Sequence, residues 1–373
     1  MNRSLHSEPV VIIASSEFTL KSAPVRRTLE QRLLDDIRTA LTRAGIENLR
    51  PEKHAGRIVI RGAQDAETVT QACSKIFGVA YAAHGLLVSS SMDDIVQAAV
   101  NIASERLEND QTFAIRAHRS GPSSISRREV EIRGGSEVLA KLKQRRVEVR
   151  LNRPDVTIFV DLADDRAYVY SVKVPGPGGL PLSSQWKMLA VLDSGPLSIL
   201  AAYSMMRRGC MVELFIPISK QIEIFGPDFQ FDLARRLRRF VTRNDYRAYT
   251  FELDDIHSLA VEGEIIEADM KHYVRNAALG FARQKRFKGI ILSDLTGSLS
   301  KIQGEFEGAA VPPVPFYPLI GLDKEDLVQL SGEVGVTLEG LGWASGETIQ
   351  IVARETQCPL RKDPTEFVKP VLL

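Results

Sequence analysis

The chain has 373 residues, of which 44% are hydrophobic and 25% are charged, and its formal net charge is +1. This composition is ordinary for a soluble globular protein with two or three domains. No apolar run reaches the roughly 18 residues of a membrane helix, and the N-terminus lacks the pattern of a signal peptide, so we expect a cytoplasmic protein. The widely spaced Cys73, Cys210 and Cys358 form no CxxC pair and no zinc spacing, so no metal site is assigned.

The first block of the chain, residues 1–75, shows both strand and helix patterns. We expect strands at 9–14 and 57–61 and helices at 24–44 and 65–76. In the longer helix, Leu29, Leu33, Ile37 and Leu41 recur every four residues, which is typical of one buried helix face. The pattern predicts a small α+β domain.

The second block, residues 76–175, carries a local excess of positive charge. We expect strands at 113–117, 146–150, 156–161 and 167–172, with a helix between the first two. Residues 111–160 contain eleven Lys or Arg against five Asp or Glu. Such an excess can neutralise several phosphates, although a solvated basic surface would look the same. The candidate RNA-binding residues are Arg116, Arg119, Arg127, Arg128, Lys143, Arg145 and Arg146.

The third block, residues 176–373, begins after a linker rich in Pro and Gly and alternates strands with helices. We expect strands at 188–192, 211–218, 247–253 and 289–293 and helices at 196–208, 228–243, 267–284 and 323–334. This alternation predicts a parallel sheet, whose ligands bind beyond the carboxyl ends of the strands. The loops 193–198 and 293–298 are therefore expected to face one site. A second basic cluster, 234–247, could contact RNA or pair with acids such as Asp232.

The loop after the first strand of this block is "DSGPLS", residues 193–198. Gly195 permits close approach of a ligand to the backbone, and Pro196 suits the first position of a helix. A helix N-terminus attracts anions, so this loop could hold a phosphate. Asp193 or Ser194 could equally be a simple helix cap. The residues alone leave both interpretations open.

Several stretches in succession resemble the tRNA 4-thiouridine synthetases of the ThiI type. "SGPLS" is similar to the PP-loop of ATP-pyrophosphatase domains, and "FAIRAHRSGPSSIS" with "LNRPDVTIFVDLADDRAYVY" is similar to the THUMP domain. "SSEFTLKSAPVRRTLEQRL", "PFYPLIGLDKEDLVQL" and "QCPLRKDPTEFVK" resemble other segments of the family in the same order. The likeness therefore covers nearly the whole chain.

The resemblance implies an α/β protein with three domains. These are an N-terminal ferredoxin-like α+β domain (1–75), a THUMP RNA-binding domain (76–175) and a Rossmann-like, parallel-sheet PP-loop domain of the adenine nucleotide alpha hydrolase type (176–373). The family reaction is the ATP-dependent adenylation and thiolation of uridine 8 in tRNA, held by its acceptor end. The implied cofactors are ATP and Mg²⁺ if the PP-loop functions, and otherwise none. Further partners would be a sulfur donor protein, a second copy of the chain in a homodimer, or an active paralogue. Association with a membrane is not expected.

The resemblance also assigns site residues. Cys358 matches the late cysteine that takes part in sulfur transfer, whereas Cys73 and Cys210 are expected in the core. The nucleotide-binding candidates are Asp193, Ser194, Gly195, Ser198, Ser293, Asp294 and Gln303. Arg119 has a counterpart in the THUMP segment.

Two departures from the family pattern bear on activity. Leu197 and Leu295 stand where the family has aspartates, which removes possible ligands for Mg²⁺. Asp193 at the lip of an anion site would repel phosphates unless a metal intervened. Three functions remain open: an ATP-dependent tRNA sulfurtransferase with an altered site, a non-catalytic tRNA-binding paralogue or partner subunit, and a PP-loop enzyme acting on a small adenylated substrate.

Overall fold

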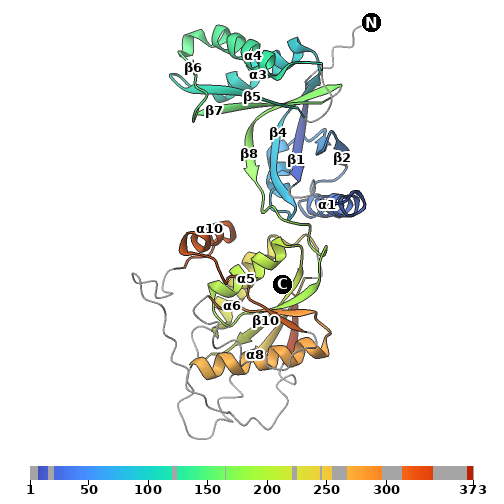
Figure 1. Cartoon of the computed structure of the whole chain (residues 1–373), viewed down its shortest axis with the longest axis vertical. Helices are drawn as coiled ribbons and strands as arrows, with labels where there is room; N and C mark the ends of the chain where they lie inside the picture. Colours follow the sequence, from blue (N-terminus) through green and yellow to red (C-terminus); the bar gives the residue numbers. More distant parts are fainter. Residues whose placement is uncertain are drawn as a thin grey trace. The chain divides into compact units, whose positions relative to one another are not determined.

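The computed structural model describes residues 7–15, 21–119, 124–163, 165–220, 225–243, 246–253, 267–295, 313–338 and 368–372. The chain forms two compact units, unit 1 (Met1–Gly179) and unit 2 (Leu180–Leu373). Among the described residues, no helix combines the length and apolar character that crossing a membrane requires. Each unit is built on its own sheet (Figure 1).

Unit 1 contains one sheet of eight strands, in the order β2-β3-β1-β4-β8-β7-β5-β6. Its strands are β1 (Glu8–Ser15), β2 (Pro51–His54), β3 (Arg57–Arg61), β4 (Val79–Ser89), β5 (Thr112–Arg119), β6 (Glu148–Val149), β7 (Val156–Leu162) and β8 (Arg166–Pro175). Its helices are α1 (Ala23–Arg43), α2 (Ala66–Cys73), α3 (Met92–Arg106), α4 (Arg127–Lys141) and the short 3₁₀ turn η2 (Lys143–Arg145). The strands predicted for two separate N-terminal domains thus lie in a single sheet.

This sheet curls so that distant strands meet. The long strands β4 and β8 pair antiparallel, with a register shift between His84 and Gly85. A side chain at Gly85 would lie 2.1 Å from the carbonyl oxygen of Val169, so glycine permits this close crossing. The Nε atom of Arg57 on β3 also lies 3.2 Å from Oδ2 of Asp161 on β7, although three strands separate them in the sheet. The buried Asp161 carboxylate therefore joins the two halves of unit 1.

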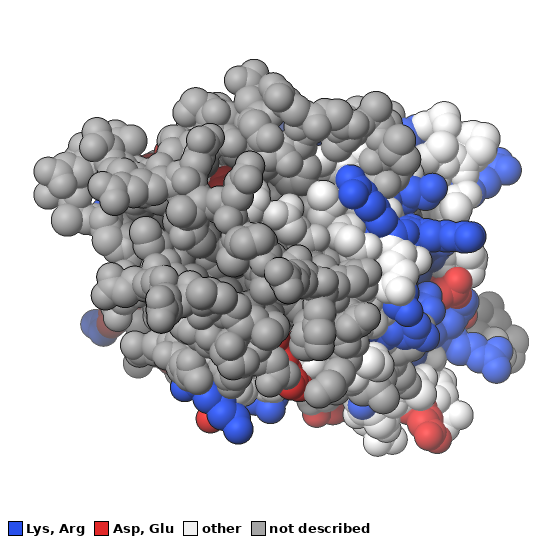
Figure 2. Space-filling view, turned by 90° about the horizontal axis from the view of Figure 1, so that it is seen from below, with Lys and Arg blue, Asp and Glu red and all other residues white. Residues whose placement is uncertain are grey.

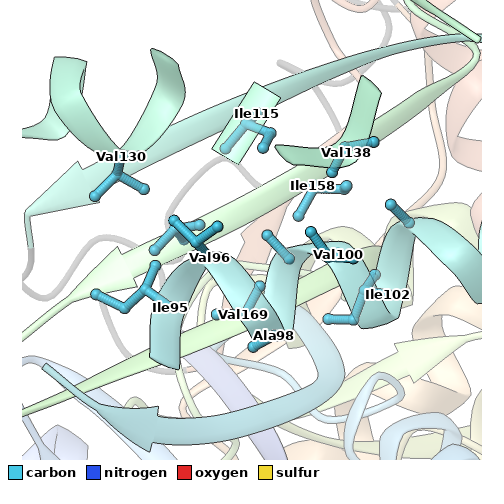
Figure 3. Close-up of a cluster of buried hydrophobic side chains, with 14 of the residues drawn as sticks. Ile95, Val96, Ala98, Val100, Ile102, Ile115, Val130, Val138, Ile158 and Val169 are labelled. Carbon is cyan, nitrogen blue, oxygen red and sulfur yellow. The ribbon is translucent and has the colours of Figure 1, made fainter. Parts of the chain in front are cut away.

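The basic block of the sequence is supported by a large apolar core. Side chains of α3 and α4 pack against β5, β7 and β8 in one buried cluster (Figure 3). Ile95 and Val100 of α3, Val138 of α4 and Ile158 of β7 belong to it. The core fixes the position of α4, whose first turn carries two of the predicted RNA-binding arginines.

Unit 2 contains a sheet of six strands in the order β13-β12-β9-β10-β11-β14. The strands are β9 (Lys187–Val191), β10 (Met211–Ile218), β11 (Arg247–Glu252), β12 (Gly289–Ile291), β13 (Val314–Phe316) and β14 (Val368–Leu372). The helices are α5 (Pro196–Arg207), α6 (Pro227–Arg238), α8 (Glu267–Gln284) and α10 (Lys324–Val334). Five strands are parallel, as predicted for a Rossmann-like sheet, whereas β14 joins the edge of β11 antiparallel.

The parallel strands place their carboxyl ends at one edge of the sheet. β9 lies between β12 and β10, and the segments after β9 and β12 both begin at this edge. Strand β9 is buried from Met188 to Val191, which is typical of a central parallel strand. The predicted meeting of the loops after β9 and β12 is thus confirmed by the topology.

Candidate functional site

The loop after β9 turns sharply into α5. Gly195 has φ +55° and ψ −130°, a backbone conformation that glycine adopts far more readily than other residues, and Pro196 follows at the start of the helix. Gly195 is the N-cap residue, and no side chain caps the helix. Neither Asp193 nor Ser194 therefore acts as the simple cap that the sequence left open.

Asp193 lies at the centre of a buried polar cluster. Its side chain has no solvent exposure. The hydroxyls of Ser194, Ser198 and Ser293 lie 3.1, 3.4 and 3.3 Å from its Oδ1 atom and donate hydrogen bonds to it. The backbone N–H of Ser194 donates to Ser198 Oγ at 3.0 Å. Four of the predicted site residues are therefore joined by one hydrogen-bond network.

Arg275 of α8 provides the positive charge of this cluster. Its Nε atom lies 2.6 Å from Asp193 Oδ2, and its Nη2 atom lies 3.0 Å from Asp294 Oδ2. The Arg275 side chain is 10% exposed. The sequence analysis did not single out this residue. A signal was present, because Arg275 follows Val274 on the buried face of α8, and a buried arginine needs an acidic partner.

The prediction that Asp193 lies at the lip of an anion site is therefore wrong. The carboxylate is fully buried, and the Arg275 guanidinium lies beside it and compensates its charge. The physical reason is that Arg275 and three serine hydroxyls enclose the carboxylate, and a buried charge is stable only when it is paired and hydrogen-bonded. As arranged, Asp193 has no exposed surface with which to contact a nucleotide.

Asp294 completes the cluster from the segment after β12. Burial raises the pKa of the Asp294 carboxyl, the Arg275 guanidinium acts to lower it, and the Asp193 carboxylate raises it further. Among the described residues, two carboxylates thus share one guanidinium, and ionised carboxylates repel phosphates.

The described residues contain no group of three or more His, Cys, Asp or Glu side chains that could hold a metal ion. Cys73 and Cys210 are buried, which confirms the prediction that they belong to the core, and burial raises the pKa of the Cys73 thiol to about 12. Cys358 and Gln303 lie outside the described residues.

An open hollow of about 910 Å³ lies at the end of β5 and the start of α4. It is lined by Ala117, Arg119, Ser124, Ser126, Arg127, Arg128 and Glu131. Three of the predicted RNA-binding arginines thus come together here. Arg119 donates from Nη2 to the carbonyl of Ile125 at 3.1 Å, which holds its guanidinium at the rim.

Arg145, another candidate, is engaged within unit 1. Its Nη1 atom donates to the carbonyl oxygens of Ser104 at 2.7 Å and Leu107 at 2.6 Å, at the end of α3. A cation at a helix C-terminus compensates carbonyl groups that have no intrahelical partner. These bonds give Arg145 a structural role.

The remaining RNA-binding candidates are exposed around the same block. Arg116 donates from Nη2 to the carbonyl of Leu151 at 2.8 Å, and Arg146 pairs with Asp110 at 2.8 Å. Lys143 is exposed in the turn η2. Their contact with RNA stays a prediction.

The second basic cluster, on α6, makes contacts inside unit 2. Arg236 pairs with Asp232 at 2.8 Å and also donates to the carbonyl oxygen of Gly335. Arg239 donates to the carbonyl oxygen of Val334 at the end of α10. Arg236 and Arg239 are therefore engaged within unit 2, whereas Arg247 of the same cluster is exposed and its contact with RNA stays a prediction.

Comparisons with known proteins match both units. Residues 10–83 match the sequence model of the ThiI ferredoxin-like domain, and residues 89–172 match that of the THUMP domain. A probable tRNA sulfurtransferase of Methanosarcina mazei is 27% identical over 341 residues, which cover 87% of this chain and 82% of that protein. A tRNA sulfurtransferase of Pyrobaculum aerophilum is 29% identical over 344 residues, which cover 87% and 66%.

Two solved structures share the fold. A crystal structure described as a 4-thiouridine synthetase–RNA complex with bound ATP aligns with a TM-score of 0.69 and 21% identity, covering 88% of this chain and 85% of that one. A protein from Pyrococcus horikoshii aligns with a TM-score of 0.64 and 22% identity, covering 88% of this chain and all of the other. At these identities the likeness establishes the fold alone.

Proposed function

Because the chain belongs to the ThiI-type family of tRNA sulfurtransferases, we propose that it binds tRNA through unit 1, at the hollow beside α4. The observation that carries this proposal is the placement of Arg127 and Arg128 in the first turn of α4. Cations at a helix N-terminus oppose the helix dipole, and the one carboxylate of the same turn, Glu129, stands against two arginines, so a bound anion would stabilise this arrangement.

The hollow has the chemistry of a phosphate site. Ser126 is the N-cap residue of α4 but makes no side-chain cap, so backbone N–H groups and two serine hydroxyls face the same region as the arginines. Within the described residues, neither Arg127 nor Arg128 has an ion-pair partner that would offset its charge. An RNA phosphate would supply that charge.

We further propose that the chain binds tRNA without using ATP. The hydroxyls of Ser194, Ser198 and Ser293 donate inward to Asp193, so as arranged they do not serve a phosphate. The cluster they form carries two carboxylates against one guanidinium. The described residues of the two loops therefore do not fit a nucleoside triphosphate, and a non-catalytic tRNA-binding relative accounts for them best.

The alternative is an ATP-dependent sulfurtransferase with a rearranged loop. The tRNA sulfurtransferases among the relatives, and the bound ATP of the 4-thiouridine synthetase structure, favour this alternative. It requires Asp193 to leave its guanidinium partner when the nucleotide binds.

Salt-dependent binding of total tRNA tests the RNA site. The double variant Arg127→Gln/Arg128→Gln should flatten the slope of log K against log salt by roughly 1.4 to 1.8, because each phosphate contact contributes about 0.7 to 0.9. The matched control is Arg26→Gln/Arg27→Gln on α1, which removes the same charge from exposed positions. Equal slopes for the two variants would refute the site.

Calorimetry with ATP and Mg²⁺ tests the nucleotide proposal. We expect no binding heat at millimolar ATP, with or without saturating tRNA. Saturable heat that disappears in the Ser198→Ala variant would show that the loop opens for the nucleotide, and would favour the sulfurtransferase alternative.

A further inference from the structure

A group of exposed cations lines the amino-terminal ends of the strands in unit 2, and we call it the basic edge. It consists of Lys187, Arg247, Arg283, Lys285, Arg286 and Lys288. Lys187 and Arg247 begin β9 and β11, and the other four come from residues 283–288 at the end of α8 and before β12, a stretch without a carboxylate. In the view from below, many of the Lys and Arg side chains that are drawn lie on the right, with some Asp and Glu among them, and others lie at the lower left (Figure 2).

The basic edge is held in place by the backbone. The N–H of Lys288 donates to the carbonyl oxygen of Lys187 at 3.2 Å, which ties the segment after α8 to the start of β9. Arg286 has φ +58°, the left-handed conformation that turns the chain from helix to strand. The ammonium group of Lys187 lies 4.8 Å from the ring centre of Phe287. These contacts fix where the charges lie.

The acid on the neighbouring strand does not neutralise the edge. Glu213 of β10 is 5% exposed, and its carboxylate is bound by Lys187 at 2.9 Å and by the hydroxyl of Tyr249 at 3.0 Å. Among the described residues at the amino-terminal ends of these strands, Glu213 is the one carboxylate that accompanies the six cations of the basic edge. The charge of the other five cations therefore faces solvent.

An exposed aromatic residue adjoins these charges. Trp186 is 59% exposed, and its carbonyl oxygen accepts a hydrogen bond from the N–H of Met211, which anchors its backbone beside Lys187. A surface that combines cations with an exposed indole is suited to RNA. The cations bind the phosphates, and an unpaired base stacks on the indole ring. An acidic peptide would use the charges but has no need of the indole.

We propose that the basic edge is a second RNA-binding surface, which contacts phosphates through its cations and an unpaired base through Trp186. The inference rests on the proposed tRNA-binding function and adds a surface in unit 2 to the hollow in unit 1. Because the strands are parallel, this surface lies at the end of the sheet opposite the loop that contains Asp193. RNA bound here leaves that loop uncovered.

The test compares two variants of the full chain that lose the same charge. Arg283→Gln/Lys285→Gln/Lys288→Gln removes three cations of the basic edge, and Arg208→Gln/Arg235→Gln/Lys324→Gln removes three exposed cations elsewhere in unit 2. With total tRNA, the first variant should flatten the salt slope by roughly 2 to 2.7 relative to the second. Identical slopes for the two variants would overturn the proposal, and would leave an acidic protein as the partner to examine.

Tryptophan fluorescence gives an independent readout. The chain has two tryptophans, so the Trp343→Phe variant reports on Trp186 alone. Quenching of this signal by total tRNA is expected, and Trp186→Ala should weaken binding at least about five-fold. An unchanged signal under saturating tRNA would contradict the stacking contact.

The two RNA proposals fail in different ways. If the Arg127 and Arg128 variant loses binding while the basic-edge variant matches its control, the basic edge is refuted and the hollow stands. If the basic-edge variant alone loses binding, the basic edge stands and the hollow is refuted. If the unaltered chain does not bind total tRNA, both are refuted.

Discussion

Replacing Arg275 with methionine tests the buried charge cluster most directly. The change removes the guanidinium whose Nε atom lies 2.6 Å from Asp193 Oδ2 and whose Nη2 atom lies 3.0 Å from Asp294 Oδ2, while preserving much of the side-chain volume. Asp193 is fully buried, so its carboxylate would lose its charge partner without gaining water. Breaking one side of a buried ion pair costs about 3–5 kcal/mol in the free energy of unfolding.

This cost converts into a large shift of the melting temperature. Unit 2 has about 190 residues, and for units of this size 1 kcal/mol corresponds to roughly 2–4 °C. The Arg275→Met variant should therefore melt roughly 6–20 °C below the unaltered chain at neutral pH. Both tryptophans, Trp186 and Trp343, belong to unit 2, so the melting curve followed by tryptophan fluorescence reports on this unit alone.

Two further measurements separate charge from packing. Burial raises the pKa of the Asp294 carboxyl, and Arg275 acts to lower it, so this pKa rises further in the variant and the variant is relatively most stable at low pH. The deficit should shrink as the pH falls from 7 toward 4. The double variant Asp193→Asn/Arg275→Met should recover much of the loss, because it removes the uncompensated charge. A melting temperature within about 2 °C of the unaltered chain for Arg275→Met would refute the reasoning.

Three other predictions follow from single contacts. Arg145→Ala should destabilise unit 1 by roughly 1–3 kcal/mol, seen as faster amide exchange at the end of α3, with the tRNA salt slope unchanged. The Asp294→Asn variant should be at least as stable as the unaltered chain at pH 7, because burial raises the pKa of this carboxyl and disfavours its ionised form. As the pH falls through that raised pKa, the carboxyl becomes neutral, and the difference in melting temperature between the two proteins should vanish. Arg57→Met should lower the unfolding free energy of unit 1 by about 3–5 kcal/mol, measured by circular dichroism, because it leaves Asp161 buried without its cation.

Much of the secondary structure follows from local patterns in the sequence. The four-residue spacing of Leu29, Leu33, Ile37 and Leu41 corresponds to the buried stripe of α1, and the apolar runs of the third block correspond to β9, β10 and β11. The strand expected at 146–150 is reduced to Glu148–Val149, because Arg146 adopts a left-handed conformation. Strand β4 and helix α3 were not predicted, although Ser91 caps α3 in the usual way.

The sequence by itself determined the alternation of strands and helices in the third block, the parallel character of its sheet and the meeting of the loops after β9 and β12, because these depend on periodicity and on strand order. Only the tertiary structure decided that Asp193 is buried and paired with Arg275, which lies 82 residues away in the chain. It also decided that the strands of the two predicted N-terminal domains form one curled sheet, joined by Arg57 and Asp161. Local patterns reflect neighbours within a few residues, whereas the burial and pairing of a charge depend on which distant elements the fold brings together.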